Sequence, residues 1–201
     1  RRHAGLRLSQ TALVMEALVP AILEQKVTGR EASRAWRSLL LRFGDPAPGP
    51  APDGMRVVPT PQRWASLPSW EWHRAGVGPN RSGTVVRAAR LARQLEDVAN
   101  RSGHEVESRL RTVPGIGAWT AAEVRQRALG DPDAVSVGDF HLPRLVAYNL
   151  AGEERADDDR MLELLEPYSG QRYRACLLLA RVGSLPPRRA PRLPVRDFRR
   201  I

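Results

Sequence analysis

The sequence predicts an all-α fold. Apolar residues recur at helical spacing along most of the 201 residues, and helix caps and glycines separate the runs. No segment shows the alternation of apolar and polar residues that is typical of a strand. Hydrophobic residues make up 42% of the chain, which is enough for a core. The length suits one compact domain or two small lobes, and no segment is long and apolar enough to span a membrane.

The first third of the chain predicts two helices and a loop. Residues 13–22 carry one apolar face, in which Pro20 is a kink or a break. Thr28 and Glu31 form a capping box that begins a second helix, and a glycine after its apolar face ends it. Residues 45–61 contain six prolines, so they predict a surface loop.

The remaining helices are read from the same periodicity. Residues 62–76 carry three tryptophans on short helical pieces, and residues 80–99 predict one longer helix. Helical runs on both sides of a short turn predict a hairpin at about 106–129. Three further helices are expected over residues 139–150, 157–166 and 171–182, and residues 186–201 form a basic, proline-rich tail.

The turn inside this hairpin is apolar and holds two glycines, Val113-Pro114-Gly115-Ile116-Gly117. Glycine permits positive φ and a close approach of the backbone. The turn leaves N–H groups free at the start of the next helix, which makes an anion site. Because the formal charge is +10 and the pI about 11.2, the expected anion is a DNA phosphate. Taken alone, the turn is equally consistent with a helix connection that binds nothing.

The wider string VPGIGAWTA, followed by SVGDF, resembles the helix-hairpin-helix DNA glycosylases, most closely their alkylated-purine (3-methyladenine, AlkA-like) branch. The similarity includes AILEQKVTGREA (residues 21–32) and EPYSGQRYRACLLL (residues 166–179), so it spans most of the chain. The resemblance implies that residues 1–201 form a two-lobed helical glycosylase core with the active site in the cleft between the lobes.

The resemblance also implies the reaction. We expect a monofunctional DNA glycosylase that flips an alkylated purine, such as 3-methyladenine, out of duplex DNA and hydrolyses its N-glycosidic bond in base excision repair. Asp139 falls on the family's catalytic aspartate. A carboxylate beside C1′ stabilises the charge that develops on the sugar and can orient the attacking water. By position alone, Asp139 is more typical of an ordinary N-cap.

Further residues of the expected base pocket are Trp119, Tyr168 and Glu123. Relatives that also cut the DNA backbone carry a lysine at the place of Trp119, so no lyase activity is expected. Trp119 either stacks on an electron-poor flipped base or fills the core. Tyr168 is a second stacking candidate. Glu123 stands where some relatives carry an aromatic residue.

The resemblance places the DNA backbone on the hairpin, at Gly115, Ile116, Gly117, Ala118 and Thr120. It places Gln25 and Lys26 near the residue that fills the gap left by a flipped base. The alternative for this pair is an exposed helix end. Lys26 is the only lysine of the chain, and every other strong base is an arginine.

Cofactors are not expected to be required. The family's hairpin can hold Na+ or K+ through main-chain carbonyls, which here belong to Arg111, Val113 and Ile116. Cys176 is the only cysteine, so an iron–sulfur glycosylase, whose cluster needs four, is excluded. The acidic run at residues 157–159 precedes a helix, which favours an N-cap over a metal site.

The expected partner is double-stranded DNA with damaged bases, and no membrane is expected. The protein is expected to be a monomer in the bacterial cytoplasm, associated with the nucleoid. The second hypothesis is a noncatalytic helix-hairpin-helix DNA-binding module that uses only the hairpin. Such a module would not require Asp139, so release of damaged bases distinguishes the two.

Overall fold

The structure, a computed structural model, describes residue 3, residues 5–184 and residue 197. Within this part of the chain, all regular elements are helical, and the one extended pairing is an isolated bridge between Pro46 and Arg56. The all-α prediction is therefore confirmed. The predicted tail at residues 186–201 lies outside the described residues, apart from Asp197. No helix among the described residues is long and apolar enough to cross a membrane.

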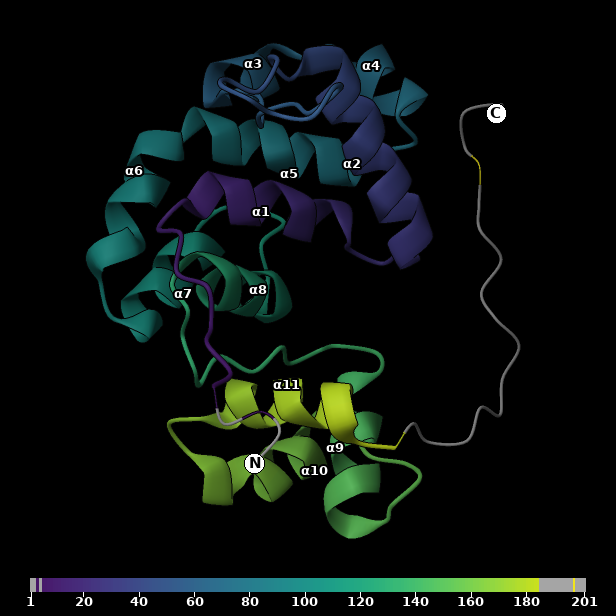
Figure 1. The fold of residues 1–201 in the computed structure, drawn as a ribbon, viewed down its shortest axis with the longest axis vertical. Helices are drawn as coiled ribbons and strands as arrows, with labels where there is room; N and C mark the ends of the chain where they lie inside the picture. The colour runs from purple at the N-terminus through teal and green to yellow at the C-terminus, as the bar shows by residue number, and fades with distance from the viewer. Residues whose placement is uncertain (1–2, 4, 185–196, 198–201) are drawn as a thin grey trace.

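The larger, N-terminal lobe is built around the helix α1 (Figure 1). Eight of the ten residues of α1 are buried, so it forms the centre of the core. The helix continues through Pro20, which is therefore not a break. The helix α1 spans Val14–Leu23. Around it lie α2 (Gly29–Phe43), α3 (Pro61–Ser66), α4 (Ser69–Arg74), α5 (Pro79–Arg90), α6 (Ala92–Glu96), the 3-10 turn η1 (Asp97–Asn100), α7 (Gly103–Arg111) and α8 (Ala118–Ala128).

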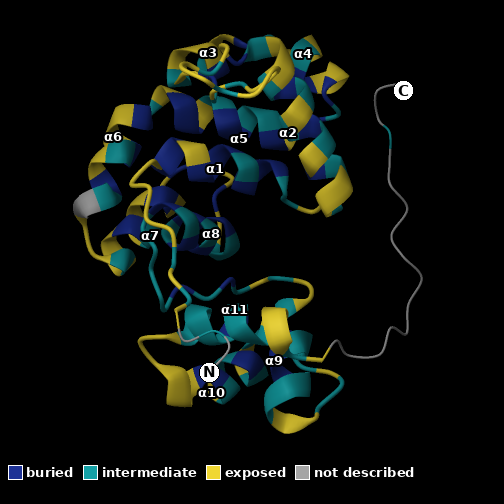
Figure 2. Ribbon diagram, viewed as in Figure 1, coloured by how far each residue is buried: buried dark blue, intermediate teal, exposed yellow. Residues whose placement is uncertain are grey.

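The smaller, C-terminal lobe has its own core. Its elements α9, α10, η2 and α11 span Leu142–Ala151, Asp158–Leu165, Glu166–Tyr168 and Arg172–Val182. The fully buried side chains of its core come from Val146, Met161, Leu165 and Cys176. In Figure 2 the buried residues are concentrated in the N-terminal lobe, and few lie in the C-terminal one. The N-terminal lobe therefore buries more apolar surface than the C-terminal lobe, and this burial gives it more hydrophobic stabilisation.

Polar contacts join the lobes at the segment that precedes α9. The side-chain amide of Gln126, on α8, donates to the carbonyl of Ala134 and to the hydroxyl of Ser136, both at 2.8 Å. Asp133 binds Arg172 at the start of α11 through the backbone amide, at 3.0 Å, and through two guanidinium nitrogens. Hydrogen bonds depend on direction, so these contacts fix the orientation of the small lobe against α8.

Most local predictions are confirmed. The capping box exists, with the Thr28 amide donating to Glu31 at 2.9 Å. The single helix expected over residues 80–99 is wrong, because the chain bends at Leu91 into α5, α6 and η1. The bend brings the Glu96 carboxylate onto the first amides of α1, those of Val14 and Met15, at 2.9 and 2.8 Å. Because α1 has no side-chain cap of its own, this distant carboxylate supplies one.

Candidate active site

Asp139 and Trp119 meet where the two lobes join. The indole N–H of Trp119, on the first turn of α8, donates to Oδ2 of Asp139 at 3.2 Å. The backbone amides of His141 and Leu142 donate to Oδ1 at 2.7 and 2.8 Å. Three donors from two lobes therefore fix the carboxylate. A carboxylate offers about four lone-pair sites, so at least one on Oδ2 remains for a water or a sugar.

The helix after Asp139 begins later than the sequence predicted. It was expected to span residues 139–150, but α9 begins at Leu142, so a start at Asp139 is wrong. The turn at Gly138, with φ of 89°, and the bond from the Asp139 amide to the Ser136 carbonyl keep the backbone outside the helix. Asp139 still accepts from the first free amides of α9, where the helix dipole favours a negative charge.

The hairpin consists of α7, the turn at residues 112–117 and α8. Only one of its two glycines needs the conformational freedom of glycine. Gly115 has a φ of 98°, and a Cβ there would lie 2.1 Å from Oγ1 of Thr84. Gly117 has a φ of −100°, and a Cβ there would meet nothing within 4 Å. Gly117 is exposed and precedes α8, whose first amides have no acceptor within the helix.

Two side chains from outside the hairpin brace its turn. The Gln25 amide nitrogen donates to the Gly115 carbonyl and to the Thr120 hydroxyl, both at 2.9 Å. The guanidinium of Arg87, on α5, donates to the Pro114 carbonyl at 3.1 Å. The amide hydrogens of Gln25 are thus occupied by the hairpin. Arg87 was not among the residues predicted, because its role depends on how α5 packs against the turn.

The other predicted DNA contacts differ in exposure. Lys26 is exposed and adopts a left-handed conformation, with φ of 53°, directly after the braced Gln25. Ile116 and Thr120 are buried, so their side chains do not face solvent. Ala118 is the first residue of α8 and is half-buried. The groups that the hairpin turn can offer to an anion are therefore backbone amides.

Glu123 lies one turn after Trp119 on α8 and has a side chain that is 12% exposed. It accepts from the Ser136 hydroxyl at 2.6 Å and pairs with Arg127 at 2.5 Å. Burial raises the pKa of Glu123. The charge of Arg127 and the hydrogen bond from the Ser136 hydroxyl oppose this rise, whereas the charges of Glu24 and Asp139 add to it. Glu123 is therefore part of a polar network at the same junction as Asp139.

The two tyrosines of the C-terminal segment are placed differently. Tyr168 is 41% exposed in η2, and among the described residues no hydrogen bond or ring contact joins it to Trp119 or Asp139. Tyr173, on the first turn of α11, is half-buried beside the network. Its pKa is raised mainly by burial and, to a smaller extent, by the negative charge of Glu123. Sequence reasoning missed Tyr173. Its five-residue distance from Tyr168 gives no signal of which ring faces α8.

The acidic run caps a helix as expected. Asp157 accepts from the Arg160 amide at 3.0 Å, and Asp158 accepts from the Gly138 amide at 3.0 and 3.1 Å. Asp158 thereby helps to hold the loop that carries Asp139. No group of three His, Cys, Asp or Glu residues in the described part of the chain is arranged to hold a metal ion.

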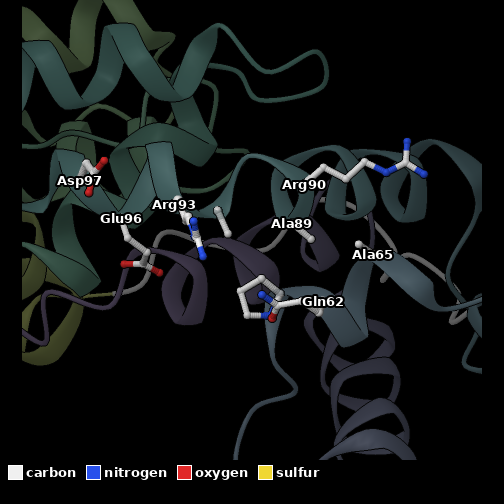
Figure 3. A pocket seen from close by; sticks show the side chains of 9 residues that line it. Gln62, Ala65, Ala89, Arg90, Arg93, Glu96 and Asp97 are labelled. Carbon is white, nitrogen blue, oxygen red and sulfur yellow. The ribbon is translucent and has the colours of Figure 1, made fainter.

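An open depression of about 600 Å³ lies on the surface of the N-terminal lobe (Figure 3). It is lined by residues of α3, α5, α6 and η1, including Gln62, Arg90, Arg93 and Glu96. None of the residues that line it belongs to the hairpin or to the Asp139 loop. Glu96 is already occupied as the cap of α1, so the depression is unrelated to the candidate site.

No family model matches the chain. Among curated proteins, it is 31% identical over 148 residues to the "Probable bifunctional transcriptional activator/DNA repair enzyme AlkA" of Mycobacterium tuberculosis. The match covers 73% of this chain but 29% of that protein, so the chain corresponds to less than a third of the relative's length.

Solved structures with the same architecture are DNA glycosylases. The 3-methyladenine DNA glycosylase of Archaeoglobus fulgidus matches with a TM-score of 0.75 and 22% identity, over 89% of this chain and 61% of that one. The DNA-3-methyladenine glycosidase of Bacillus halodurans matches with a TM-score of 0.68 and 20% identity, over 90% of this chain and 81% of that one. The chain therefore has the fold of the helix-hairpin-helix DNA glycosylases and resembles their AlkA-like, alkylated-purine branch in sequence.

Proposed function

We propose that this chain is a DNA glycosylase that excises alkylated purines, such as 3-methyladenine, from duplex DNA in base excision repair. The observation that carries the proposal is the Asp139 carboxylate, fixed by Trp119 and by two amides of α9 at the junction of the lobes. A noncatalytic module would need the hairpin but no such carboxylate. The sequence match to AlkA of M. tuberculosis supports the same activity.

The chemistry that fits Asp139 is stabilisation of a cationic sugar. As the N-glycosidic bond breaks, positive charge develops at C1′, and a fixed carboxylate lowers the energy of that state without reorganising. The remaining lone pair on Oδ2 can accept a proton from the attacking water. An alkylated purine that carries a positive charge is already a good leaving group, so no separate general acid is required.

Base recognition is assigned to Trp119 and Glu123. The Trp119 ring is half-buried, and its N–H is oriented by Asp139, so a face of the ring can stack on an electron-poor base. Glu123 and Glu24 share the one cation of Arg127, so the network one turn after Trp119 keeps a net negative charge, which favours a cationic base over a neutral one. Tyr168, which is exposed in η2, remains a proposed stacking residue.

DNA backbone binding is assigned to the hairpin. The free amides at Gly117 and Ala118 face a phosphate, and the exposed Lys26 is proposed to lie at the gap left by the flipped base. Gln25 supports the turn through the hydrogen bond from its side-chain amide to the Gly115 carbonyl. Because the phosphate contacts are main-chain groups, the hairpin would bind damaged and undamaged DNA alike.

A monovalent cation at the hairpin fits the chemistry of its donors. The carbonyls of Arg111, Val113 and Ile116 are neutral oxygens, and the Arg111 carbonyl lies at the end of α7, where the helix dipole is negative. The Val113 carbonyl already accepts the Ile116 amide at 3.0 Å and keeps a second lone pair. A bound Na+ or K+ would supply positive charge toward a phosphate. No other cofactor is proposed.

Release of bases from methylated duplex DNA tests the function. The chain is incubated with DNA treated with a methylating agent, and the released bases are identified by chromatography. We expect 3-methyladenine from the wild-type chain and none from untreated DNA. Tight DNA binding without any released base would contradict the proposal and favour the noncatalytic module.

The absence of lyase activity is a separate part of the proposal. A lyase forms a Schiff base between an amine and C1′, and the indole of Trp119 cannot do so. Borohydride should therefore trap no covalent complex with damaged DNA. A crosslink that mapped to Lys26 would contradict this, because it would place an amine at C1′. We further propose that the protein acts as a monomer with the chromosomal DNA of the nucleoid, in the bacterial cytoplasm.

A further inference from the structure

Phe140 is the most exposed large hydrophobic residue among those described. Its ring is 84% exposed, more than that of Trp70 at 64%. The residue directly follows Asp139, so an apolar ring stands in solvent beside the carboxylate proposed to do the chemistry. Truncating such a ring removes almost no buried area, which means that the fold does not need it.

The loop that carries Phe140 is fixed on both sides. The Gly138 amide donates to both carboxylate oxygens of Asp158, at 3.1 and 3.0 Å. On the other side, Asp139 accepts from the amides of His141 and Leu142. The Phe140 ring itself meets the His141 ring edge-on, with centroids 4.9 Å apart and planes at 87°. The structure therefore presents this ring in a defined position.

The position of the Phe140 ring, next to Asp139, indicates which kind of ligand contacts it. Alpha carbons of consecutive residues lie about 3.8 Å apart, and consecutive bases of one strand lie about 3.4 Å apart along a duplex. A nucleotide with C1′ at Asp139 thus brings the neighbouring bases within reach of residue 140. A protein partner would require a larger apolar patch, whereas one base needs only one ring. The net charge of +10 on the chain favours a nucleic acid as its partner.

We propose that Phe140 stacks on an unstacked nucleobase next to the damaged nucleotide and so holds the opened duplex against Asp139. The proposal rests on the proposed function, because it takes the damaged nucleotide to be bound at Asp139. The side chain of Asp139 is directed to Trp119, while that of Phe140 is directed to solvent. The two aromatic residues therefore serve different bases, Trp119 the flipped one and Phe140 a neighbour.

The test uses a duplex with a tetrahydrofuran abasic analogue and 2-aminopurine at each position within two nucleotides of it. Phe140→Ala and Phe140→Trp are compared with the wild type and with the control Trp70→Ala. Trp70 is exposed on α4, a helix of the N-terminal lobe that lies at the top of Figure 1, away from α9, α10 and α11. Loss of one base–aromatic stack should weaken binding by about ten- to a hundredfold. We expect this loss of affinity for Phe140→Ala. Phe140→Trp should recover the wild-type affinity, and Trp70→Ala should not change it. The fluorescence change at one flanking position should be lost only in Phe140→Ala.

The outcomes separate this inference from the proposed function. Wild-type base release from methylated DNA is measured first on the same preparations. If release is normal and Phe140→Ala matches the wild type in binding and fluorescence, the stacking proposal alone is overturned. If Phe140→Leu also recovers full binding, any apolar contact suffices and stacking is likewise overturned. If the wild type neither binds the abasic duplex nor releases bases, both proposals fail.

Discussion

At the residue scale, the site depends on one carboxylate with a defined set of partners. Asp139 is held by donors from α8 and α9, which lie in different lobes. An ordinary N-cap uses only the amides of its own helix. The additional bond from Trp119 therefore distinguishes Asp139 from a residue that only stabilises α9.

Asp139→Asn should reduce single-turnover excision by at least ~10²-fold and leave DNA binding within twofold, because the change removes the negative charge but keeps an acceptor for the amides of His141 and Leu142. Rates are measured with excess protein on methylated duplex. Asp159→Asn, at an exposed position of α10, is the matched control. Near-wild-type excision by Asp139→Asn would rule out the catalytic assignment.

Trp119 combines a ring and an N–H, and two substitutions separate them. Trp119→Phe keeps an aromatic face but removes the donor to Asp139, so it should lower the rate of excision and leave the affinity for lesion DNA nearly unchanged. Trp119→Ala should lower both, with little effect on plain duplex. Equal rates for Trp119→Phe and the wild type would show that the indole N–H does not position the carboxylate.

At the element scale, the hairpin offers a glycine pair whose members should respond differently. Gly117→Ala leaves the turn unstrained, because its φ is −100° and its new Cβ meets nothing within 4 Å. If a phosphate lies against this turn, the added methyl should weaken binding to damaged and undamaged duplex alike. Gly115→Ala should instead destabilise the fold, because its Cβ would collide with Thr84 at a φ of 98°.

Binding is measured by titration at several salt concentrations, with thermal unfolding as the check on folding. The log–log slope for the wild type should be roughly −0.9 per phosphate contacted. A folded Gly117→Ala variant that binds plain duplex normally would limit the hairpin to a structural turn. Unchanged thermal stability of Gly115→Ala would contradict the predicted collision.

The second prediction at this scale concerns the link between α11 and the segment before α9. Hydrogen bonds from Arg172 hold the pKa of Asp133 below its usual range. Stability from this pair is fully present above the ordinary aspartate pKa of about 4, and it is lost as the pH falls through the lowered value. Asp133→Asn should therefore cost about 1 kcal/mol near neutral pH and less in acid. Melting curves of both proteins between about pH 2 and 7 check this, and a constant difference would contradict it.

At the scale of the whole molecule, two cores of unequal size are joined by polar contacts. The small core contains Cys176, whose side chain is 4% exposed, and burial raises the pKa of this thiol to about 12. The folded protein should resist thiol reagents at neutral pH, because the reactive thiolate is absent. Labelling of Cys176 thus measures opening of the C-terminal lobe.

Met161→Ala, in the same core, should destabilise that lobe by about 2–5 kcal/mol and accelerate labelling of Cys176. The matched control is Leu39→Ala, which makes a similar cavity in the large core. If the lobes open separately, Met161→Ala accelerates labelling more than Leu39→Ala does. Equal acceleration by the two variants would mean that the lobes unfold as one unit.

Local patterns in the sequence were sufficient for the helical class, the capping box at Thr28, the cap at Asp157 and the position of the hairpin. Each of these depends on neighbours within one or two helical turns, because apolar periodicity and caps act over that range. Trp119 and Asp139 were each assigned to the active site from the resemblance to a family, whereas the hydrogen bond between them is seen only in the structure.

Contacts between distant segments determine the rest. The bend at Leu91 places Glu96 on the first amides of α1, which lie more than eighty positions away in the chain. For the same reason, the bracing of the hairpin by Gln25 and Arg87 and the position of Tyr173 near Glu123 have no local signal. Helix periodicity sets which face of a helix is buried, but it does not specify the partner, because many partners satisfy one apolar face. Only the packing of the two lobes selects which polar side chains surround Asp139.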